Sequence, residues 1–277
     1  MTIKLLDTIR KLNIPKVILR FIMMNFLDLS TINNLLLTVK DMNVLDNYSK
    51  DLLAKAKNGF RWNCENGHLT VAKWLYSQGD VNIHAGDKYR DADAFQLSCE
   101  CGHLAVAKWL YDLGEFNIHA DKEYAFRSCC EYGHLTVAKW LYSFGNVDIH
   151  VFNDETFQVS CENGHLETAK WLYSLGNVHI HANDDECVFR TACANGDLTI
   201  AKWLYSLGEN SPRDKINIHA DDERVFRLAC RHGHLAVAKW LYVLGGINVH
   251  AIIRGKKRYL SKFSDKKILT WLEELKN

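Results

Sequence analysis

A tandem repeat is the feature of this sequence that most constrains its fold. Tryptophan followed by leucine recurs at intervals of 35, 31, 31, 32, 37 and 31 residues. The repeated tryptophans are Trp74, Trp109, Trp140, Trp171, Trp203, Trp240 and Trp271. Each of the first six follows a Cys by ten residues, and each of those Cys follows a Phe by four. Such units cannot bury their apolar faces alone and must stack on their neighbours.

Each unit predicts two short helices joined by a tight turn. Phe and Cys four residues apart lie on one face of a helix, as with Phe126 and Cys130. Gly133 follows, a residue type that commonly ends a helix because it adopts positive φ without strain. The next segment, from Leu135 to Leu141, carries apolar residues at helical spacing. The sequence therefore predicts an all-α chain built from helix pairs.

The repeated motif resembles the ankyrin repeat. G-H-L followed by V-A-K-W-L-Y-x-x-G is similar to the second helix of that repeat, and N-I-H-A to its closing D-V-N-A. Over residues 58–277 this implies an all-α ankyrin-type solenoid of stacked helix pairs with short hairpin or linker fingers. It would comprise six full units and a degenerate C-terminal capping unit. The K-W-L-Y-S-L-G variant resembles ankyrin proteins expanded in giant amoeba-infecting viruses of the mimivirus type.

Two departures from the ankyrin pattern bear on the fingers. The family's T-P-L-H is replaced here by x-x-F-R or x-x-F-Q. Four of the six intervals are also shorter than the family's 33 residues. We therefore expect the hairpin fingers to be shorter than those of the ankyrin family.

Charge and composition bear on partners and location. The 34 Lys and Arg balance 33 Asp and Glu, so no net field attracts nucleic acid, and no apolar run is long enough to span a membrane. Nine cysteines without an export signal indicate a reducing, intracellular compartment. We expect a monomer in a host cytoplasm, with the nucleus as the alternative if Lys256–Arg258 act as a localisation signal.

The recurring Cys, His and Trp residues are interpreted as structural. Neighbouring helices lie about 8–10 Å apart, whereas Zn–S bonds measure about 2.3 Å, so equivalent cysteines cannot share an ion. We expect the tryptophans to be core residues between helix pairs. The His after each turn glycine, such as His134, is expected to cap the second helix. The His of N-I-H-A, such as His119, is expected to tie successive linkers together. Neither a phosphate-binding loop nor a nucleophile motif is present, so we expect no catalytic residue, cofactor or metal.

Polar residues in register predict a partner-binding surface. The ankyrin resemblance implies that partners meet the fingers and concave groove, lined by an Arg and Gln column and by linker acids. These residues are Arg127, Gln158, Arg190, Arg227, Asp154, Asp185 and Asp222. The acids have an alternative role, which is to cap the helix that follows. An insertion after His84 adds Tyr89 and Arg90, residue types enriched at interfaces, although neutral loop drift explains it equally well.

Residues 1–57 lack the repeat and predict amphipathic helices. The segment from Ile14 to Lys40 resembles an F-box, with Ile18, Ile22, Phe26 and Leu27 as the residues that would dock a Skp-type adaptor. The alternative is a helical cap on the array. We therefore expect a non-catalytic scaffold for protein partners of a host cell. The sharper form of this expectation is a substrate receptor of a cullin-type ubiquitin ligase. The alternative function is a nucleic-acid-binding or structural array in which residues 1–57 serve only as a cap.

Overall fold

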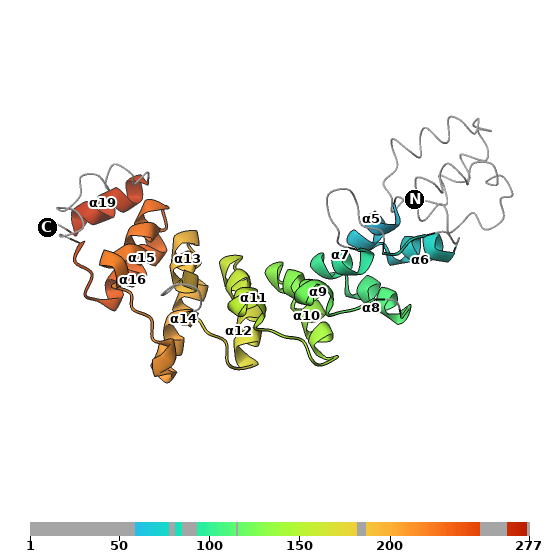
Figure 1. The fold of residues 1–277 in the computed structure, drawn as a ribbon. Helices are drawn as coiled ribbons and strands as arrows, with labels where there is room; N and C mark the ends of the chain where they lie inside the picture. The colour runs from blue at the N-terminus through green and yellow to red at the C-terminus, as the bar shows by residue number, and fades with distance from the viewer. Residues whose placement is uncertain are drawn as a thin grey trace, which may run out of the picture. The chain divides into compact units, whose positions relative to one another are not determined.

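Short helices make up all the regular structure in the part of the chain that the computed structural model describes (Figure 1). That part comprises residues 59–77, 81–84, 93–114, 116–181, 187–249 and 265–275. The expected all-α ankyrin architecture is confirmed. Of the hairpin or linker fingers expected, the described ones are linkers, which contain no strand and form turns.

Helices alternate between a first and a second member of each pair. The first helices are α5 (Phe60–Glu65), α7 (Ala94–Glu100), α9 (Ala120–Glu131), α11 (Val151–Glu162), α13 (Cys187–Asn195) and α15 (Ala220–Arg231). The second helices are α6 (Leu69–Ser77), α8 (Leu104–Asp112), α10 (Leu135–Tyr142), α12 (Leu166–Ser174), α14 (Leu198–Asn210) and α16 (Leu235–Leu244). A short 3-10 helix η1 (Pro212–Asp214) follows α14, and α19 (Lys266–Glu274) is the last described helix.

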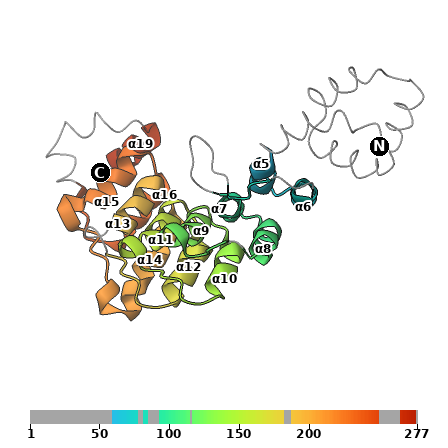
Figure 2. The same cartoon turned by 45° about the vertical axis from the view of Figure 1, so that its right-hand side comes forward.

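The chain divides into two compact units. The first comprises residues up to Ser98 together with Ala105–Glu115, and the second comprises Cys99–Leu104 and everything from Phe116 onward. In the first unit, α5 packs against α6. In the second, the first helices α9, α11, α13 and α15 pack successively side by side (Figures 1 and 2). Each of them also packs against the second helix of its own pair, as α11 does against α12.

Two residue columns form the fully buried core. The six repeated Phe side chains and the six repeated Cys side chains are all between 0 and 2% exposed. Each fully buried Phe contributes roughly 1.5–3 kcal/mol from the hydrophobic effect. Burial also raises the pKa of the Cys161 and Cys193 thiols, and it raises that of Cys64 and of Cys230 to about 12. These cysteines are therefore packing residues with little thiolate character.

The repeated tryptophans whose side chains the structure describes lie between successive repeats, as expected, but they are half-buried rather than part of the fully buried core. Trp171 shows why. Its ring meets Tyr142 of the preceding repeat edge-to-face, with centroids 5.6 Å apart at 88°, and lies 6.1 Å from Phe126. The nitrogen of Lys139 lies 6.0 Å from the same ring. One edge of the indole therefore stays open, while the other joins two repeats.

Candidate functional site

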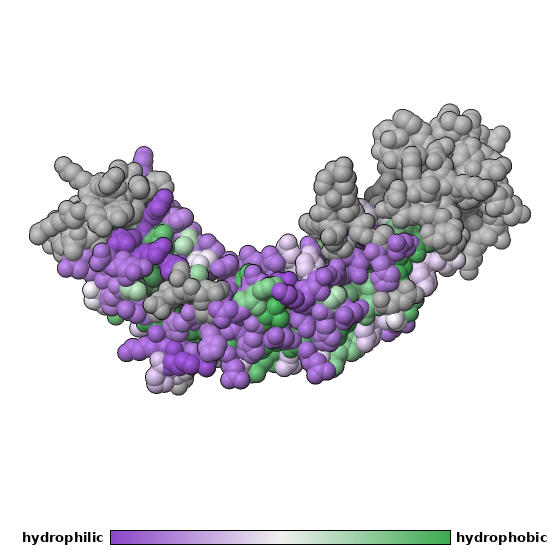
Figure 3. All heavy atoms as spheres, viewed as in Figure 1, coloured by the Kyte–Doolittle hydropathy of each residue, from purple (hydrophilic) through white to green (hydrophobic). Residues whose placement is uncertain are grey.

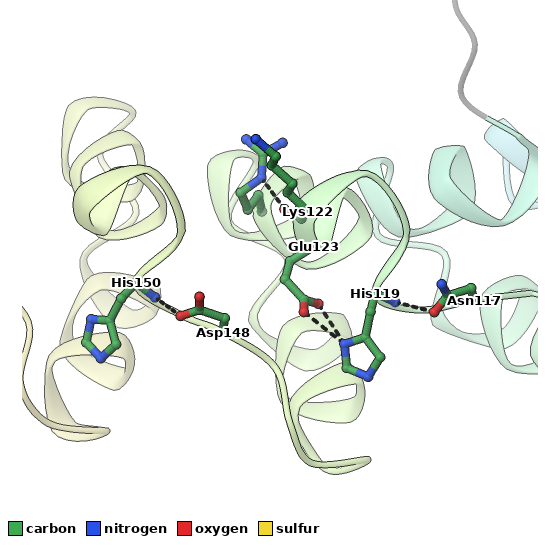
Figure 4. Close-up of polar contacts among 7 residues, drawn as sticks. Asn117, His119, Lys122, Glu123, Asp148 and His150 are labelled. Atoms are coloured by element: carbon green, nitrogen blue, oxygen red, sulfur yellow. Dashed lines mark hydrogen bonds and ion pairs between the residues drawn. The ribbon is translucent and has the colours of Figure 1, made fainter.

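Three linkers of the second unit begin with a turn closed by an Asn or Asp side chain. The backbone N–H of His119 donates to Oδ1 of Asn117 over 3.0 Å, and that of His150 donates to Oδ1 of Asp148 over 2.9 Å (Figure 4). His219 and Asn217 repeat the same contact at 3.0 Å. This N-x-H or D-x-H element sets the direction in which the chain enters the next turn.

Three consecutive residues then adopt the left-handed conformation. They are Asp121–Glu123, Phe152–Asp154 and Asp221–Glu223, with φ between 52° and 63°. This conformation costs a residue other than Gly roughly 1–2 kcal/mol, so the surrounding contacts must hold each turn in place. We refer to the surface formed by these turns and by the Arg and Gln column on the first helices as the turn face.

A His–carboxylate pair closes each described left-handed turn. Nδ1 of His119 lies 2.8 Å from a carboxylate oxygen of Glu123 (Figure 4), and Nδ1 of His219 lies 2.9 Å from one of Glu223. The corresponding distance from His150 to Asp154 is 2.6 Å. The role expected for these His side chains is thus corrected: each binds an acid within its own linker, because the left-handed turn brings the fourth residue back to the ring.

Asp154 supplies a link between successive linkers. While one of its oxygens pairs with His150, the other accepts the backbone N–H of His179 over 2.9 Å. The Asp154 side chain is only 2% exposed. This carboxylate therefore stabilises the stack from inside, and it is not available on the surface to a partner.

The Arg and Gln column holds the same turns from the first helices. Nε of Arg127 donates to the carbonyl of Lys122 over 2.9 Å, Nε2 of Gln158 to that of Asn153 over 2.8 Å, and Nη2 of Arg227 to that of Asp221 over 3.0 Å. Gln158 is 7% exposed. The Arg side chains are half-buried and keep part of their surface on the turn face. The structure thus gives this column an internal role that sequence reasoning missed, although the recurring Arg or Gln eight residues after His was a signal for it.

The turn face carries an exposed aromatic residue beside two cations. Phe152, in the turn that opens α11, is 49% exposed. Lys122 and Arg127 come from the preceding repeat, with Nζ and Cζ 4.9 and 4.8 Å from the centre of its ring. Nη1 of Arg127 also lies 3.2 Å from a carboxylate oxygen of Glu155. In the view of Figure 3 the surface over α9 to α15 is mostly hydrophilic, with a hydrophobic patch among the polar residues.

The other residues expected at the partner-binding site are either on the first helices and their turns or outside the described residues. Asp222 is exposed on the turn face, and Arg190 is half-buried on α13. Asp185, Tyr89 and Arg90 are outside the described residues, as are the adaptor-docking residues Ile18, Ile22, Phe26 and Leu27. For these positions the sequence-based predictions stand as predictions.

The other His column packs against the turn glycines. No side-chain hydrogen bond caps α10, α12 or α16, so the expected capping role of His134, His165 and His234 is wrong. Instead a Cβ added to Gly102, Gly133 or Gly196 would collide with the ring of the His one repeat later. Burial and the neighbouring His103 and His165 lower the pKa of His134.

The insertion at Glu209–Lys215 lengthens α14 and folds back onto the preceding linker. The Tyr173 hydroxyl donates to Oδ2 of the buried Asp214 over 2.7 Å, and Nη2 of Arg213 donates to the carbonyl of Val178 over 3.1 Å. Burial, and then the hydrogen bond to Asp214, raise the pKa of Tyr173 to about 12. A small cleft of about 210 Å³ opens beside Asp214, with His179 and His181 on its wall. The insertion is thus anchored to the array.

Across the described ranges, no group of three or more His, Cys, Asp or Glu side chains has an arrangement that could hold a metal ion. The helices in those ranges are too short or too polar to cross a bilayer.

The chain stacks helix pairs on one another, and the turns between the pairs carry polar side chains. This arrangement is that of a repeat protein that serves as a binding scaffold. The family model for ankyrin repeats, which describes three copies, matches residues 60–153 and again 157–252. The chain belongs to the ankyrin-repeat family, and it is a protein–protein interaction scaffold of a fold that typically binds rather than catalyses.

Two solved structures are similar to this chain. The human ASB11 ankyrin repeat domain matches with 21% identity and a TM-score of 0.49, covering 68% of this chain and 83% of that domain. A chain from the complex of the predatory endopeptidase Bd0816 of Bdellovibrio bacteriovorus with the immunity protein Bd3460 matches with 16% identity and a TM-score of 0.51. It covers 68% of this chain and 98% of its own length. The comparison with curated proteins gave no match.

Proposed function

We propose that the chain holds a protein partner on the turn face of its second unit, without catalysis. The observation that carries this proposal is the fixed position of the Arg column. Arg127 and Arg227 each use one donor group on a turn carbonyl, which orders the side chain. Ordered side chains lose little conformational entropy on binding, and partly exposed Arg is enriched at interfaces.

The partner proposed is a protein of a host cell, in keeping with the resemblance of K-W-L-Y-S-L-G to ankyrin proteins of giant amoeba-infecting viruses. The turn face carries both signs of charge, with Asp221 and Asp222 exposed beside Arg224 and Arg227. Nη1 of Arg224 lies 3.2 Å from Oδ2 of Asp221. A mixed surface of this kind favours a protein over nucleic acid, whose phosphates would meet these carboxylates.

The chain itself offers a variant that separates binding from folding. Gln occupies the Arg position at Gln96 and Gln158, and Gln158 makes the same bond to the turn carbonyl. Replacing Arg127, Arg190 and Arg227 by Gln therefore removes three charges and retains the donors. The matched control replaces the exposed Lys139, Lys202 and Lys239 of the second helices by Gln.

The test uses tagged full-length chain as bait in an amoebal lysate, with captured proteins quantified by mass spectrometry. A prey that is lost with the Arg-to-Gln variant and kept with the Lys-to-Gln control supports the proposal, provided that the two variants have the same Tm. A prey lost only with the Lys-to-Gln control would place binding on the second helices and refute the proposed surface.

The ubiquitin-ligase receptor role rests on the F-box resemblance of residues 14–40 alone. The same experiment addresses it with Ile18, Ile22, Phe26 and Leu27 replaced by Ala. Skp and cullin captured by the original chain and lost with this variant are the expected result. Their absence from both captures would leave residues 1–57 as a cap.

A further inference from the structure

Phe152 departs from the pattern of its own position in the repeat. The residue two places after the linker His is Asp121, Phe152, Asn183 or Asp221 in four successive linkers. Asp and Asn are the residues other than Gly that most readily adopt the left-handed conformation, whereas a bulky residue there is an outlier. Phe152 nevertheless adopts it, with φ 53° and ψ 40°.

This Phe is not part of the buried core. Its side chain is 49% exposed, whereas the Phe residues of the core are at most 2% exposed. Positions at which a sequence breaks its own local rule without a packing gain are concentrated at functional sites. The groups around Phe152 therefore indicate which ligand it would meet.

Two cations from the preceding repeat lie over the Phe152 ring. They are Lys122 Nζ at 4.9 Å and Arg127 Cζ at 4.8 Å. Glu155 pairs with Arg127 over 3.2 Å. Among the residues that the structure describes, no carboxylate pairs with Lys122. The cluster thus combines an open apolar ring with one excess positive charge.

We propose that Phe152, Lys122 and Arg127 form an anchor that receives a protein segment carrying a carboxylate beside an aromatic or aliphatic side chain. The apolar side chain covers the exposed part of the Phe152 ring, and the carboxylate binds the Lys122 ammonium. This inference rests on the proposed function and names the chemistry of the partner. Arg is enriched at interface hot spots, and Phe is enriched at protein interfaces.

The test is a selection of random linear peptides, displayed on phage, against the full-length chain. We expect enrichment of peptides with Asp or Glu next to an aromatic or aliphatic residue. Phe152→Asp and Lys122→Asp should each weaken their binding about 30-fold or more, the loss typical of a hot-spot residue. Both variants introduce the residue found at the equivalent positions Asp221 and Asp222, so the turn is retained. Phe144→Ala, at an exposed Phe beyond the end of α10, is the control and should bind as the original chain does.

The outcomes separate this inference from the proposed function. The anchor would be overturned if the enriched peptides are basic, or if they bind the Phe152→Asp variant as tightly as the original chain. A selection that enriches no peptide would overturn it as well. Peptides that require Arg190 and Arg227, tested as Gln variants, but not Phe152 would overturn the anchor and leave the turn face as the binding surface. Peptides that bind every one of these variants as tightly as the original chain would overturn both the anchor and the proposed function.

Discussion

The imidazole of His165 occupies the space above Gly133 in the preceding repeat, where a Cβ would collide with Nδ1, Cε1 and Cγ of the ring. The same relationship joins His134 to Gly102 and His234 to Gly196. Gly133 also has φ 76°, a conformation that Gly adopts without strain. The glycine is therefore required twice, once for the turn and once for the stacking of the next repeat.

Gly133→Ala should destabilise the second unit by about 2–5 kcal/mol, the sum of left-handed strain and overpacking. Gly145→Ala is a control from the same repeat: its φ is 82°, and an added Cβ would meet nothing within 4 Å. It should cost only about 1–2 kcal/mol. Urea unfolding followed by circular dichroism measures both. Equal losses of unfolding free energy in the two variants would show that the His165 ring moves aside at no cost.

The pH dependence of stability should trace in part to His134. Its pKa is lowered, first by burial and then by His103 and His165. Because the unfolded chain takes up the proton near the ordinary pKa of about 6.5, the folded state is fully favoured above that pH. Stability is then lost as the pH falls from there through the lower pKa of the folded state.

The check compares the original chain with His134→Gln, which cannot titrate. Denaturant midpoints measured at about pH 7.5 and about pH 5 should fall less for the variant than for the original chain. Identical falls in the two proteins would assign the acid sensitivity to other groups.

Asp154→Ala should destabilise the array by about 2–4 kcal/mol. The change removes an acceptor from the His150 ring and leaves the backbone N–H of His179 without its partner at a site that is 2% exposed. Asp154→Asn retains one acceptor oxygen and should cost about half as much. Differential scanning calorimetry of the three proteins gives the order. A fully stable Asp154→Ala chain would mean that water replaces the carboxylate.

Tyr173→Phe should cost about 1–2 kcal/mol, because the buried Asp214 loses a donor 2.7 Å away while its surroundings stay packed. Tyr205→Phe is the control in the next repeat, since its ring makes the same edge-to-face contact with a tryptophan, 5.8 Å from Trp240. In the original chain, Tyr173 should also ionise late in an ultraviolet titration, near its raised pKa of about 12. Equal stability of the two variants would show that Asp214 does not depend on Tyr173.

Trp171→Ala should lower the stability by about 3 kcal/mol, near the lower end for removal of a large aromatic residue, because the side chain is half-buried. Trp171→Phe keeps an edge-to-face partner for Tyr142 and should recover part of that loss. Chemical unfolding monitored by far-ultraviolet circular dichroism measures both. An unchanged midpoint for Trp171→Ala would refute the role of this ring in joining repeats.

The sequence by itself determined the repeat, the helix pairs and the core. Phe126 and Cys130 share a helical face whatever lies around them, since that follows from helix geometry alone. Gly133 indicated the turn because Gly is the residue that most often ends a helix, whatever surrounds it. Six repetitions made the stacking unavoidable, because one pair has no other way to bury its apolar face.

Only the tertiary structure decided what the polar columns do. His119 and Glu123 meet because three residues between helices turn left-handed, a conformation that propensity disfavours and that neighbouring repeats must hold. His165 rests on Gly133 rather than capping its own helix because the adjacent repeat offers a space without a Cβ. Contacts of this kind depend on where the next repeat lies, and that position is set by packing across the whole interface rather than by local residue spacing.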